Sequence, residues 1–380
     1  MNLSLVRQSF PVTRKWNYLN HASVSPLPTY VREAMMSFHE ERETDGGLSY
    51  AEWFDRVEAS RDHIGKLINS PGRQIAFFSS TSHALNSVAD MLPLNQGDEV
   101  VVTDLEFPSN AFPWVRLQKR GIRVAWARSH KGILNPADVE KTLGDRTRAI
   151  AISHVCYYNG FRADLESIAE IGRKHGVAVV VDAMQSIGAL QIDVGKLNLD
   201  FVASNSYKWL LGPFGVAMLY CRDDWVTKLE AASVGWYSVK DIWSREIEKF
   251  ELATGARRFE VGHPYFAGIL GLDAAVEFLL QIGPERIERR VLSLTRKIRE
   301  GLGLYDNVRI LSPTEGISGI TLLKIDGKDP RFVVDALRER GIVVFCQSWK
   351  NGIGVKVSPH FYNTEDEVDA FVDAVGSLAG

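Results

Sequence analysis

The sequence predicts an α/β fold with a mostly parallel sheet that helices cover on both faces. From about residue 75 to 220, short apolar runs alternate with segments of helical period, which is the order of strands and helices in a parallel sheet. The apolar runs are nearly continuous rather than alternating, as expected for strands with both faces buried. A chain of 380 residues exceeds one typical core, so two domains are expected.

The expected elements of the large domain follow in chain order. The segment that begins at Asp164 shows the clearest helix signals, because Asp164 can cap the first amides and Gly176 can end the helix. Its apolar positions form one face for the sheet. Strands are expected at 75–78, 99–103, 123–127, 148–153, 177–181, 201–204 and 216–220, and helices at 82–91, 110–119 and 164–175.

The chain divides into an N-terminal segment, a large domain and a small domain, at 1–20, 21–263 and 264–380. Aromatic residues with little period fill 225–263, which predicts long connections near the site. The small α/β domain begins with a linking helix after Pro264. Helices are expected there at 267–280, 285–302, 330–340 and 364–378, and strands at 308–311, 317–325, 342–345 and 355–358.

Composition excludes several classes of function. The chain is 45% hydrophobic and 24% charged with a net charge of −3, and it has no basic stripe, so no nucleic-acid partner is expected. Its three cysteines show no metal or disulfide spacing, so we expect no metal and a cytoplasmic protein. We also expect no signal peptide and no membrane span.

An aspartate and a lysine follow two neighbouring predicted strands. Asp182 ends the strand at 177–181, and Lys208 comes shortly after the strand at 201–204. Pyridoxal phosphate (PLP) needs a lysine for its Schiff base and an acid that keeps its ring nitrogen protonated. Thr81 and Phe107 follow strands as well. Ligands bind at the carboxyl ends of strands in such sheets, so we expect these four residues to converge on one PLP site.

Thr81 and Ser82 open a predicted helix, where hydroxyls and free amides suit a phosphate dianion. Taken alone, the same pair is also what an ordinary helix cap requires. Lys208 lies between apolar strands and beside Trp209, so burial is expected to lower its pKa and free the amine for attack on an aldehyde.

With these motifs, the chain resembles the class V aminotransferase family, which includes cysteine desulfurases, kynureninases, isopenicillin N epimerases and cystine C–S lyases. The resemblance runs from about Tyr18 to Val375 and is most specific around Lys208 and at Asp182-Ala183-Met184-Gln185. It implies the fold-type I PLP architecture, with a seven-stranded sheet in the large domain and a small C-terminal domain. It also implies a homodimer whose active sites are shared between the subunits.

The resemblance further implies roles for particular residues. Lys208 is the catalytic residue, which holds PLP and shuttles the Cα proton of a small amino-acid substrate. The remaining PLP contacts are expected at Asp182 and Gln185 on the ring, Phe107 stacked on the ring, Thr81, Ser82, Asn205 and Tyr207 at the phosphate, and His263 at the neighbouring subunit's phosphate. The substrate is expected to meet His21, Ser23, Arg258 and Lys356.

Several positions depart from the family pattern. Lys356 stands where the family has a carboxylate-binding arginine, and offers a point charge instead of a bidentate fork. The desulfurase loop that carries a nucleophilic cysteine is shortened here, with Cys346 only at its start. Transamination of a small amino acid is therefore expected first. Desulfurase-like or C–S lyase elimination and epimerisation remain as alternatives, and so does an inactive binding protein of the same fold.

Overall fold

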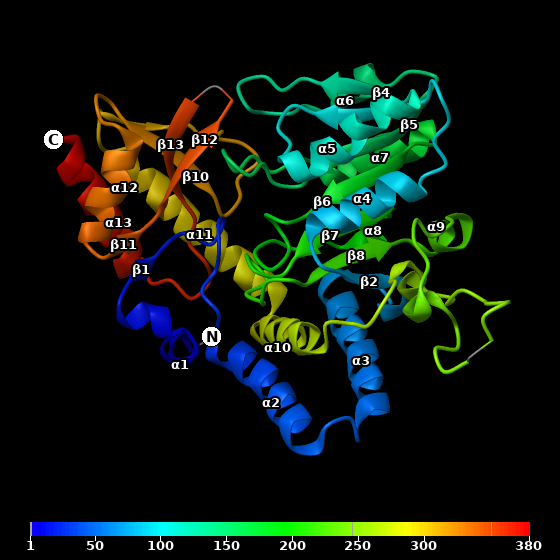
Figure 1. Cartoon of the computed structure of the whole chain (residues 1–380). Helices are drawn as coiled ribbons and strands as arrows, with labels where there is room; N and C mark the ends of the chain where they lie inside the picture. The colour runs from blue at the N-terminus through cyan, green and yellow to red at the C-terminus, as the bar shows by residue number, and fades with distance from the viewer. Residues whose placement is uncertain (1, 245, 351) are drawn as a thin grey trace.

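A seven-stranded sheet forms the centre of the larger part of the molecule (Figure 1). The structure is a computed structural model that describes residues 2–244, 246–350 and 352–380. The strand order is β2-β8-β7-β6-β5-β3-β4, and only β8 runs antiparallel to its neighbours. This confirms the predicted fold. The strands are β2 (Ile75–Phe78), β3 (Glu99–Thr103), β4 (Arg123–Ala127), β5 (Thr147–Ser153), β6 (Ala178–Asp182), β7 (Phe201–Asn205) and β8 (Ala217–Cys221).

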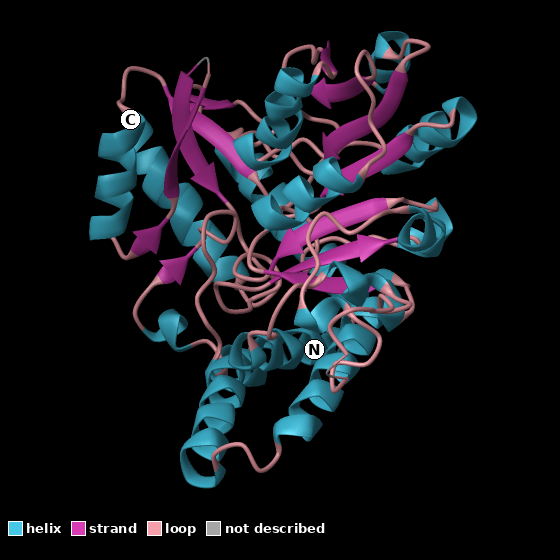
Figure 2. Cartoon of the chain, turned by 45° about the vertical axis from the view of Figure 1, so that its right-hand side comes forward, coloured by secondary structure: helices cyan, strands magenta, loops and turns pink. Residues whose placement is uncertain are grey.

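The central strand β6 shows why its apolar run is continuous. Val179 and Val181 enter one hydrophobic cluster, while Ala178 and Val180 enter a second cluster on the opposite face. Both faces of the sheet are therefore covered, so both sets of alternate side chains are apolar. Figure 2 shows helices on both sides of these strands.

The helices of the large domain begin and end close to the predicted positions. Asp164 caps α7 by accepting from the Ser167 amide at 3.1 Å, and Gly176 ends this helix with φ of 64°. The helix predicted at 110–119 begins earlier, because Pro108 occupies the first turn, where a missing N–H costs little. The helices are α4 (Thr81–Met91), α5 (Pro108–Arg116), α6 (Pro136–Thr142), α7 (Leu165–His175), α8 (Val194–Leu197) and α9 (Asp223–Lys228).

The C-terminal part contains an antiparallel sheet in the order β12-β13-β10-β9, packed against helices (Figure 1). Residues 317–320 do not extend β10 as predicted, because Ser318 donates instead to the Gly160 carbonyl of the large domain at 2.7 Å. The elements are α10 (Phe266–Ile282), α11 (Pro284–Leu302), β9 (Val308–Ile310), β10 (Thr321–Ile325), α12 (Pro330–Glu339), β11 (Ile342–Val343), β12 (Phe345–Trp349), β13 (Gly352–Val357) and α13 (Glu365–Ala379).

The N-terminal segment joins the C-terminal part of the chain. Strand β1 (Asn17–Tyr18) pairs in parallel with β11, which therefore separates from β12 within the strand predicted at 342–345. The helices α2 (Thr29–Asp45) and α3 (Tyr50–Ile68) pack against α10, and α1 (Leu3–Gln8) precedes them. No single described helix is long and apolar enough to cross a membrane, although the bent pair α10–α11 passes that test by length and composition.

A buried ion pair ties α3 to the sheet and to the segment after α9. Arg61 donates to Glu260 at 2.5 Å and to the Ile75 carbonyl at 3.0 Å, and Glu260 accepts from the Phe77 amide at 2.8 Å. The two charged side chains are only 2% and 5% exposed. Because each charge is desolvated, each depends on the other for its stability in the interior.

Glu260→Gln tests this ion pair. The variant leaves the Arg61 charge buried with only the more exposed Glu58 as a partner. We expect the free energy of unfolding in urea to fall by about 3 kcal/mol. Asp223→Asn is the control, because it breaks an exposed pair with Arg73 and should cost less than about 1 kcal/mol. Equal losses in the two variants would contradict the proposed role of the buried pair.

Candidate functional site

A cavity of about 130 Å³ lies at the carboxyl ends of the parallel strands. Strands β2, β3, β5, β6 and β7 all end at this edge, because β8 reverses direction between β7 and β2. The cavity brings together the predicted cofactor residues with the exception of His263. It is lined by Ser80, Thr81, Ser82, Phe107, Ser109, Ser153, Val155, Tyr157, Asp182, Met184, Gln185, Asn205, Tyr207 and Lys208.

Asp182 and Lys208 lie close enough in this cavity to influence each other's charge. Burial raises the pKa of the Asp182 carboxyl to about 6, although the Met184 amide and the Lys208 charge both oppose this. Burial lowers the pKa of the Lys208 amine to about 8, and the Asp182 charge opposes that shift. An amine with this pKa is partly neutral near pH 7 and can act as a nucleophile.

The N-terminus of α4 forms another wall of the cavity. Ser80 caps the helix by accepting from the His83 amide at 3.1 Å, which leaves the amides of Thr81 and Ser82 without partners inside the helix. The Ser82 hydroxyl donates to Ser109 at 2.8 Å, so two hydroxyls meet at the same wall. Free amides, hydroxyls and the helix dipole suit a phosphate dianion.

Aromatic and amide side chains complete the cavity. Phe107 is 44% exposed and lies edge-to-face with Tyr157, with ring centroids 5.1 Å apart. Tyr207 stacks on Phe214 at 4.3 Å. Gln185 is held at both ends of its amide, since it donates to the Ala22 carbonyl at 2.9 Å and accepts from a tryptophan indole at 2.9 Å. The cavity thus offers a ring-sized apolar wall beside an acid, an amine and a phosphate site, which fits PLP.

Lys356 on β13 is buried, with 3% of its surface exposed, and lies behind the residues that line the cavity without being one of them. Its amine donates to the Gln347 side chain at 2.6 Å and to the carbonyl of Tyr157, a lining residue, at 3.2 Å. Burial is the main cause that lowers the pKa of the Lys356 amine to about 7, and the charge of Lys208 is the second. Within the described residues, neither its hydrogen-bond partners nor the charges that shift its pKa include a carboxylate. An unpaired buried cation next to a cavity is suited to an anionic ligand.

The structure places the predicted substrate residues of the N-terminal loop outside the lining of the cavity, and their contact with a substrate stays a prediction. His21 is fully buried, with Nδ1 2.8 Å from the Ser358 carbonyl and Nε2 2.7 Å from the Tyr362 hydroxyl. Both ring nitrogens are therefore used inside the protein, and His21 connects the loop to the C-terminal part instead of facing the cavity. Ser23 does not line the cavity either. Only the Ala22 carbonyl of this loop reaches a lining residue, Gln185.

Two further predicted residues lie outside the cavity of their own chain. Arg258 donates to the Val226 carbonyl at 2.9 Å, so its expected substrate contact is not found within the chain. His263 is 2.6 Å from the Tyr50 hydroxyl and stacks on Trp236 at 4.6 Å. Their predicted place in a neighbouring subunit's site, and the homodimer itself, stay predictions.

Sequence reasoning did not single out Ser153 and Tyr157, which line the cavity after β5. The rule that ligands bind after strand ends would have found both. Sequence reasoning also overlooked Glu106. Its carboxyl accepts from the Ser153 amide at 2.9 Å and from the Asn110 side chain at 2.7 Å. Burial raises the pKa of Glu106 to about 7, although these hydrogen bonds oppose the shift. Glu106 therefore connects the end of β3 to the end of β5.

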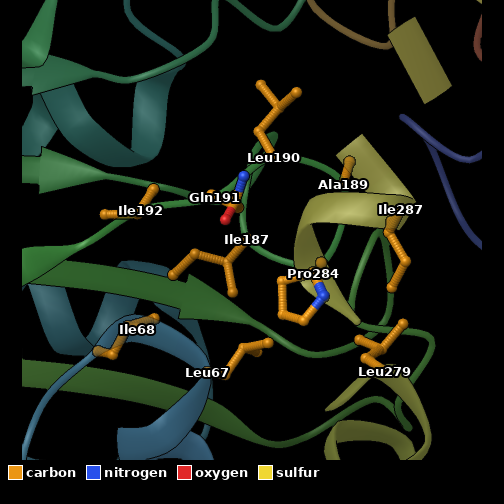
Figure 3. A pocket seen from close by; sticks show the side chains of 11 residues that line it. Leu67, Ile68, Ile187, Ala189, Leu190, Gln191, Ile192, Leu279, Pro284 and Ile287 are labelled. Atoms are coloured by element: carbon orange, nitrogen blue, oxygen red, sulfur yellow. The ribbon is translucent and has the colours of Figure 1, made fainter. Parts of the chain in front are cut away.

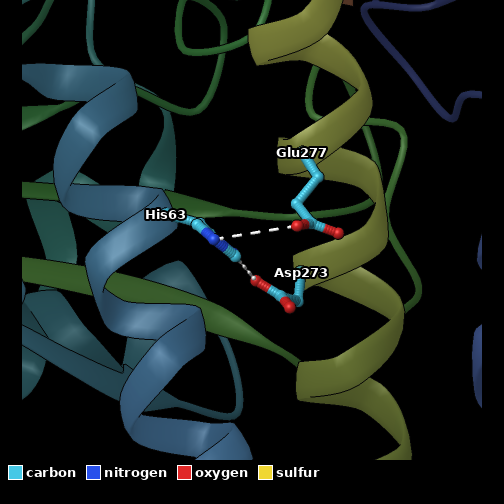
Figure 4. A group of neighbouring side chains, drawn as sticks. All are labelled: His63, Asp273 and Glu277. Atoms are coloured by element: carbon cyan, nitrogen blue, oxygen red, sulfur yellow. Dashed lines mark hydrogen bonds and ion pairs between the residues drawn. The ribbon is translucent and has the colours of Figure 1, made fainter.

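Two further features of the molecule lie outside this cavity. A second cavity of about 10 Å³ is lined mainly by apolar side chains such as Leu67, Ile187 and Leu279 (Figure 3) and has room for little more than a water. His63, Asp273 and Glu277 gather their potential metal ligands between α3 and α10 (Figure 4). In this group, however, the His63 ring is already hydrogen-bonded to the Asp273 carboxylate at 2.8 Å.

Comparisons with known proteins identify the family of the chain. The family model for aminotransferase class-V matches residues 17–371. A probable cysteine desulfurase of Methanothermobacter thermautotrophicus is 30% identical, over 99% of this chain and 98% of the relative. An uncharacterized aminotransferase of Bacillus subtilis, YcbU, is 29% identical over 98% of this chain and 96% of its own.

Solved structures show the same architecture. The apo cysteine desulfurase of Thermococcus onnurineus NA1 superposes with a TM-score of 0.91 at 28% identity, covering 99% of this chain and 98% of that one. The cystine C–S lyase C-DES, in complex with cysteine persulfide, superposes with a TM-score of 0.89 at 24% identity over 97% and 99% of the two chains, and so shows the fold. The chain belongs to the aminotransferase class-V family, which confirms the predicted family, fold and class of PLP enzyme.

Proposed function

We propose that this protein is a PLP enzyme that cleaves the carbon–sulfur bond of a cysteine-type amino acid. The observation that carries the proposal is one cavity lined by Lys208, Asp182 and the N-terminus of α4. The relatives named as probable cysteine desulfurases support a sulfur amino acid as the substrate. They favour this alternative over the transamination that the sequence suggested first.

The residues of the cavity have separate tasks. Bound PLP supplies an electron sink for negative charge at the substrate Cα. The Lys208 amine holds the cofactor and then removes the Cα proton, since burial leaves a useful fraction of it uncharged. Asp182 keeps the ring nitrogen protonated, the first turn of α4 binds the phosphate, and Phe107 covers the ring. Lys356 binds the substrate carboxylate, for which it has a free charge.

The fate of the sulfur follows from where the cysteines lie. Cys346 neighbours Lys356 and Gln347 in the β12–β13 ladder, but alternation along the strand turns its side chain to the other face. There its charged neighbours are Arg331, Asp329 and Asp335, in and just before α12. The thiol therefore points away from the cavity, and burial further raises its pKa.

The other two cysteines are also poorly placed to accept sulfur. Cys156 is 2% exposed, and burial raises the pKa of its thiol to about 12. Cys221 is buried on β8, where burial also raises its thiol pKa. Sulfur then leaves without an enzyme thiol. The Cα–H and Cβ–S bonds break, the sulfur departs as hydrogen sulfide from cysteine or as cysteine persulfide from cystine, and water converts the rest into pyruvate and ammonium.

Transamination is the second candidate. It is favoured by the same absence of a cavity-facing thiol, because exchange of an amino group with a keto acid needs no sulfur acceptor. The relative YcbU, an uncharacterized aminotransferase, is similar to this chain at nearly the same level as the desulfurases.

A panel of substrates distinguishes the two candidates. With cysteine or cystine, we expect sulfide or persulfide together with equal amounts of pyruvate and ammonium, and no need for a keto acid. Lys208→Ala should reduce this turnover by about 10²–10⁴-fold, as expected for the loss of a general base. Turnover that requires a keto acid and releases no sulfur would overturn the proposal in favour of transamination.

Cys346→Ser tests the sulfur route. The side chain faces α12, so we expect kcat for cysteine to stay within about threefold of the wild type, as for a substitution outside the site. The measurement is sulfide release in a reductant with the variant and the wild type side by side. A loss as large as that of Lys208→Ala would show instead that Cys346 accepts the sulfur.

The pH dependence of cofactor uptake tests the environment of Lys208. Burial lowers the pKa of this amine, so its neutral, reactive fraction should grow as the pH rises through about 8. The rate at which the apoprotein binds PLP covalently, followed by absorbance, should rise with the same midpoint. Asp182→Asn removes the charge that raises this pKa, and should move the midpoint lower. A wild-type midpoint near 10.5, the ordinary lysine value, would contradict the burial effect.

A further inference from the structure

The immediate surroundings of Lys356 are more specific than a buried charge requires. An ammonium group has three N–H donors and no acceptor. One donor of Lys356 meets Gln347 Oε1 at 2.6 Å, and a second meets the Tyr157 carbonyl at 3.2 Å. The third has no acceptor within the described residues. Two donors are thus fixed by the protein, and one remains for a ligand.

The strand pairing explains why Gln347 is the partner. Phe345 lies directly opposite Lys356 in the β12–β13 ladder, and Gln347 follows two residues later on the same face. The amide orientation is also determined, because only its oxygen can accept from the ammonium while its nitrogen donates to the Ser348 carbonyl at 2.6 Å. Gln347 is 7% exposed, so the contact is protected from water.

The charged groups around Lys356 do not provide a counter-charge. Lys208, from the loop after β7, places a like charge within reach and lowers the pKa of Lys356. Cys156, from the loop after β5, acts in the opposite direction, but its thiol is protonated at neutral pH because burial raises its pKa to about 12. On the hairpin itself, the nearest groups are the neutral Gln347 amide and the Phe345 ring at 5.2 Å. An arriving carboxylate is therefore the counter-charge that this arrangement lacks.

We propose that Gln347 is a positioning residue that sets the specificity for a substrate carboxylate, by holding the Lys356 amine so that its third N–H meets one carboxylate oxygen. This deepens the proposed function and rests on it for the identity of the substrate. A single directed N–H recognises one negative charge without the bidentate geometry that an arginine would demand. The site therefore selects amino acids with a free α-carboxylate over their esters and amides.

The experiment compares Gln347→Met with Ser348→Ala in the holoenzyme. Methionine keeps the volume of Gln347 but removes the acceptor, while Ser348 is the neighbour on the opposite face of the strand. Two quantities are measured: the competitive inhibition constant of propionate, which carries a carboxylate but has no amine to react, and the ratio of kcat/KM for cysteine to that for its methyl ester.

For Gln347→Met we expect propionate to bind about tenfold more weakly, the size of one hydrogen bond to a charged group. KM for cysteine should rise by a similar factor with little change in kcat, and the preference for acid over ester should shrink. Ser348→Ala should match the wild type. Lys356→Met should lose the preference completely, which identifies the amine as the group that Gln347 positions.

Gln347→Glu adds a second measurement, the pH dependence of propionate binding, which a purely structural role of Gln347 would not change. The new carboxylate would pair with Lys356 and compete with the ligand, so propionate should bind even more weakly than in Gln347→Met. In the wild type, propionate binding should weaken as the pH rises above about 7 and the amine loses its proton. In Gln347→Glu the paired amine keeps its proton to higher pH, so this weakening should begin at a higher pH.

The inference is overturned if Gln347→Met binds propionate as the wild type does, or if Ser348→Ala loses as much affinity. Because propionate does not react, this result is independent of the reaction. Normal propionate effects without sulfur release from cysteine would contradict the proposed function alone. Sulfur release with unchanged propionate binding in Gln347→Met would contradict the role of Gln347 alone.

Discussion

The reversed strand β8 is the constraint on which the cavity depends. It runs antiparallel between β7 and β2, so the chain that leaves β7 turns back at the carboxyl edge and places Lys208 there. The same reversal makes β2 parallel to β7, which brings the N-terminus of α4 to that edge. If β8 ran parallel to β7 while β2 stayed antiparallel to β8, β2 would end at the opposite edge of the sheet, and the N-terminus of α4 would lie far from Lys208.

Desolvation then gives the cavity its chemistry. Two lysines, Lys208 and Lys356, are buried within electrostatic reach of each other, and burial is the main cause that lowers the pKa of both. Only Lys208 has a carboxylate, Asp182, as a charged neighbour within the described residues. The two amines are thereby suited to different tasks. In the function that we propose, Lys208 holds the cofactor and moves a proton, and Lys356 binds an anion.

Much of the fold and part of the site could be predicted from the sequence. Asp182, Lys208, Thr81 and Phe107 could be selected from the sequence because they follow predicted strands. The signal for each is local: an apolar run followed by a polar or aromatic residue. The burial of both faces of the sheet was equally visible in the continuous apolar run of β6.

What could not be predicted depends on pairings between segments far apart in the chain. The pairing of β1 with β11 buries His21 against Ser358. The histidine that the sequence suggested as a substrate ligand therefore forms hydrogen bonds inside the protein. The partnership of Gln347 with Lys356 depends on the register of a hairpin, and a shift of one residue would have turned Gln347 to the other face.

The most direct test of the account is the identity of the lysine that carries the cofactor. Borohydride reduction of the PLP-loaded protein, followed by mass spectrometry of its peptides, should find the label on Lys208 and none in Lys208→Ala. Burial lowers the pKa of Lys356 as well, so a lowered pKa alone does not single out Lys208. A label on Lys356 in the wild-type protein would contradict the central claim that the strand edge determines which amine reacts.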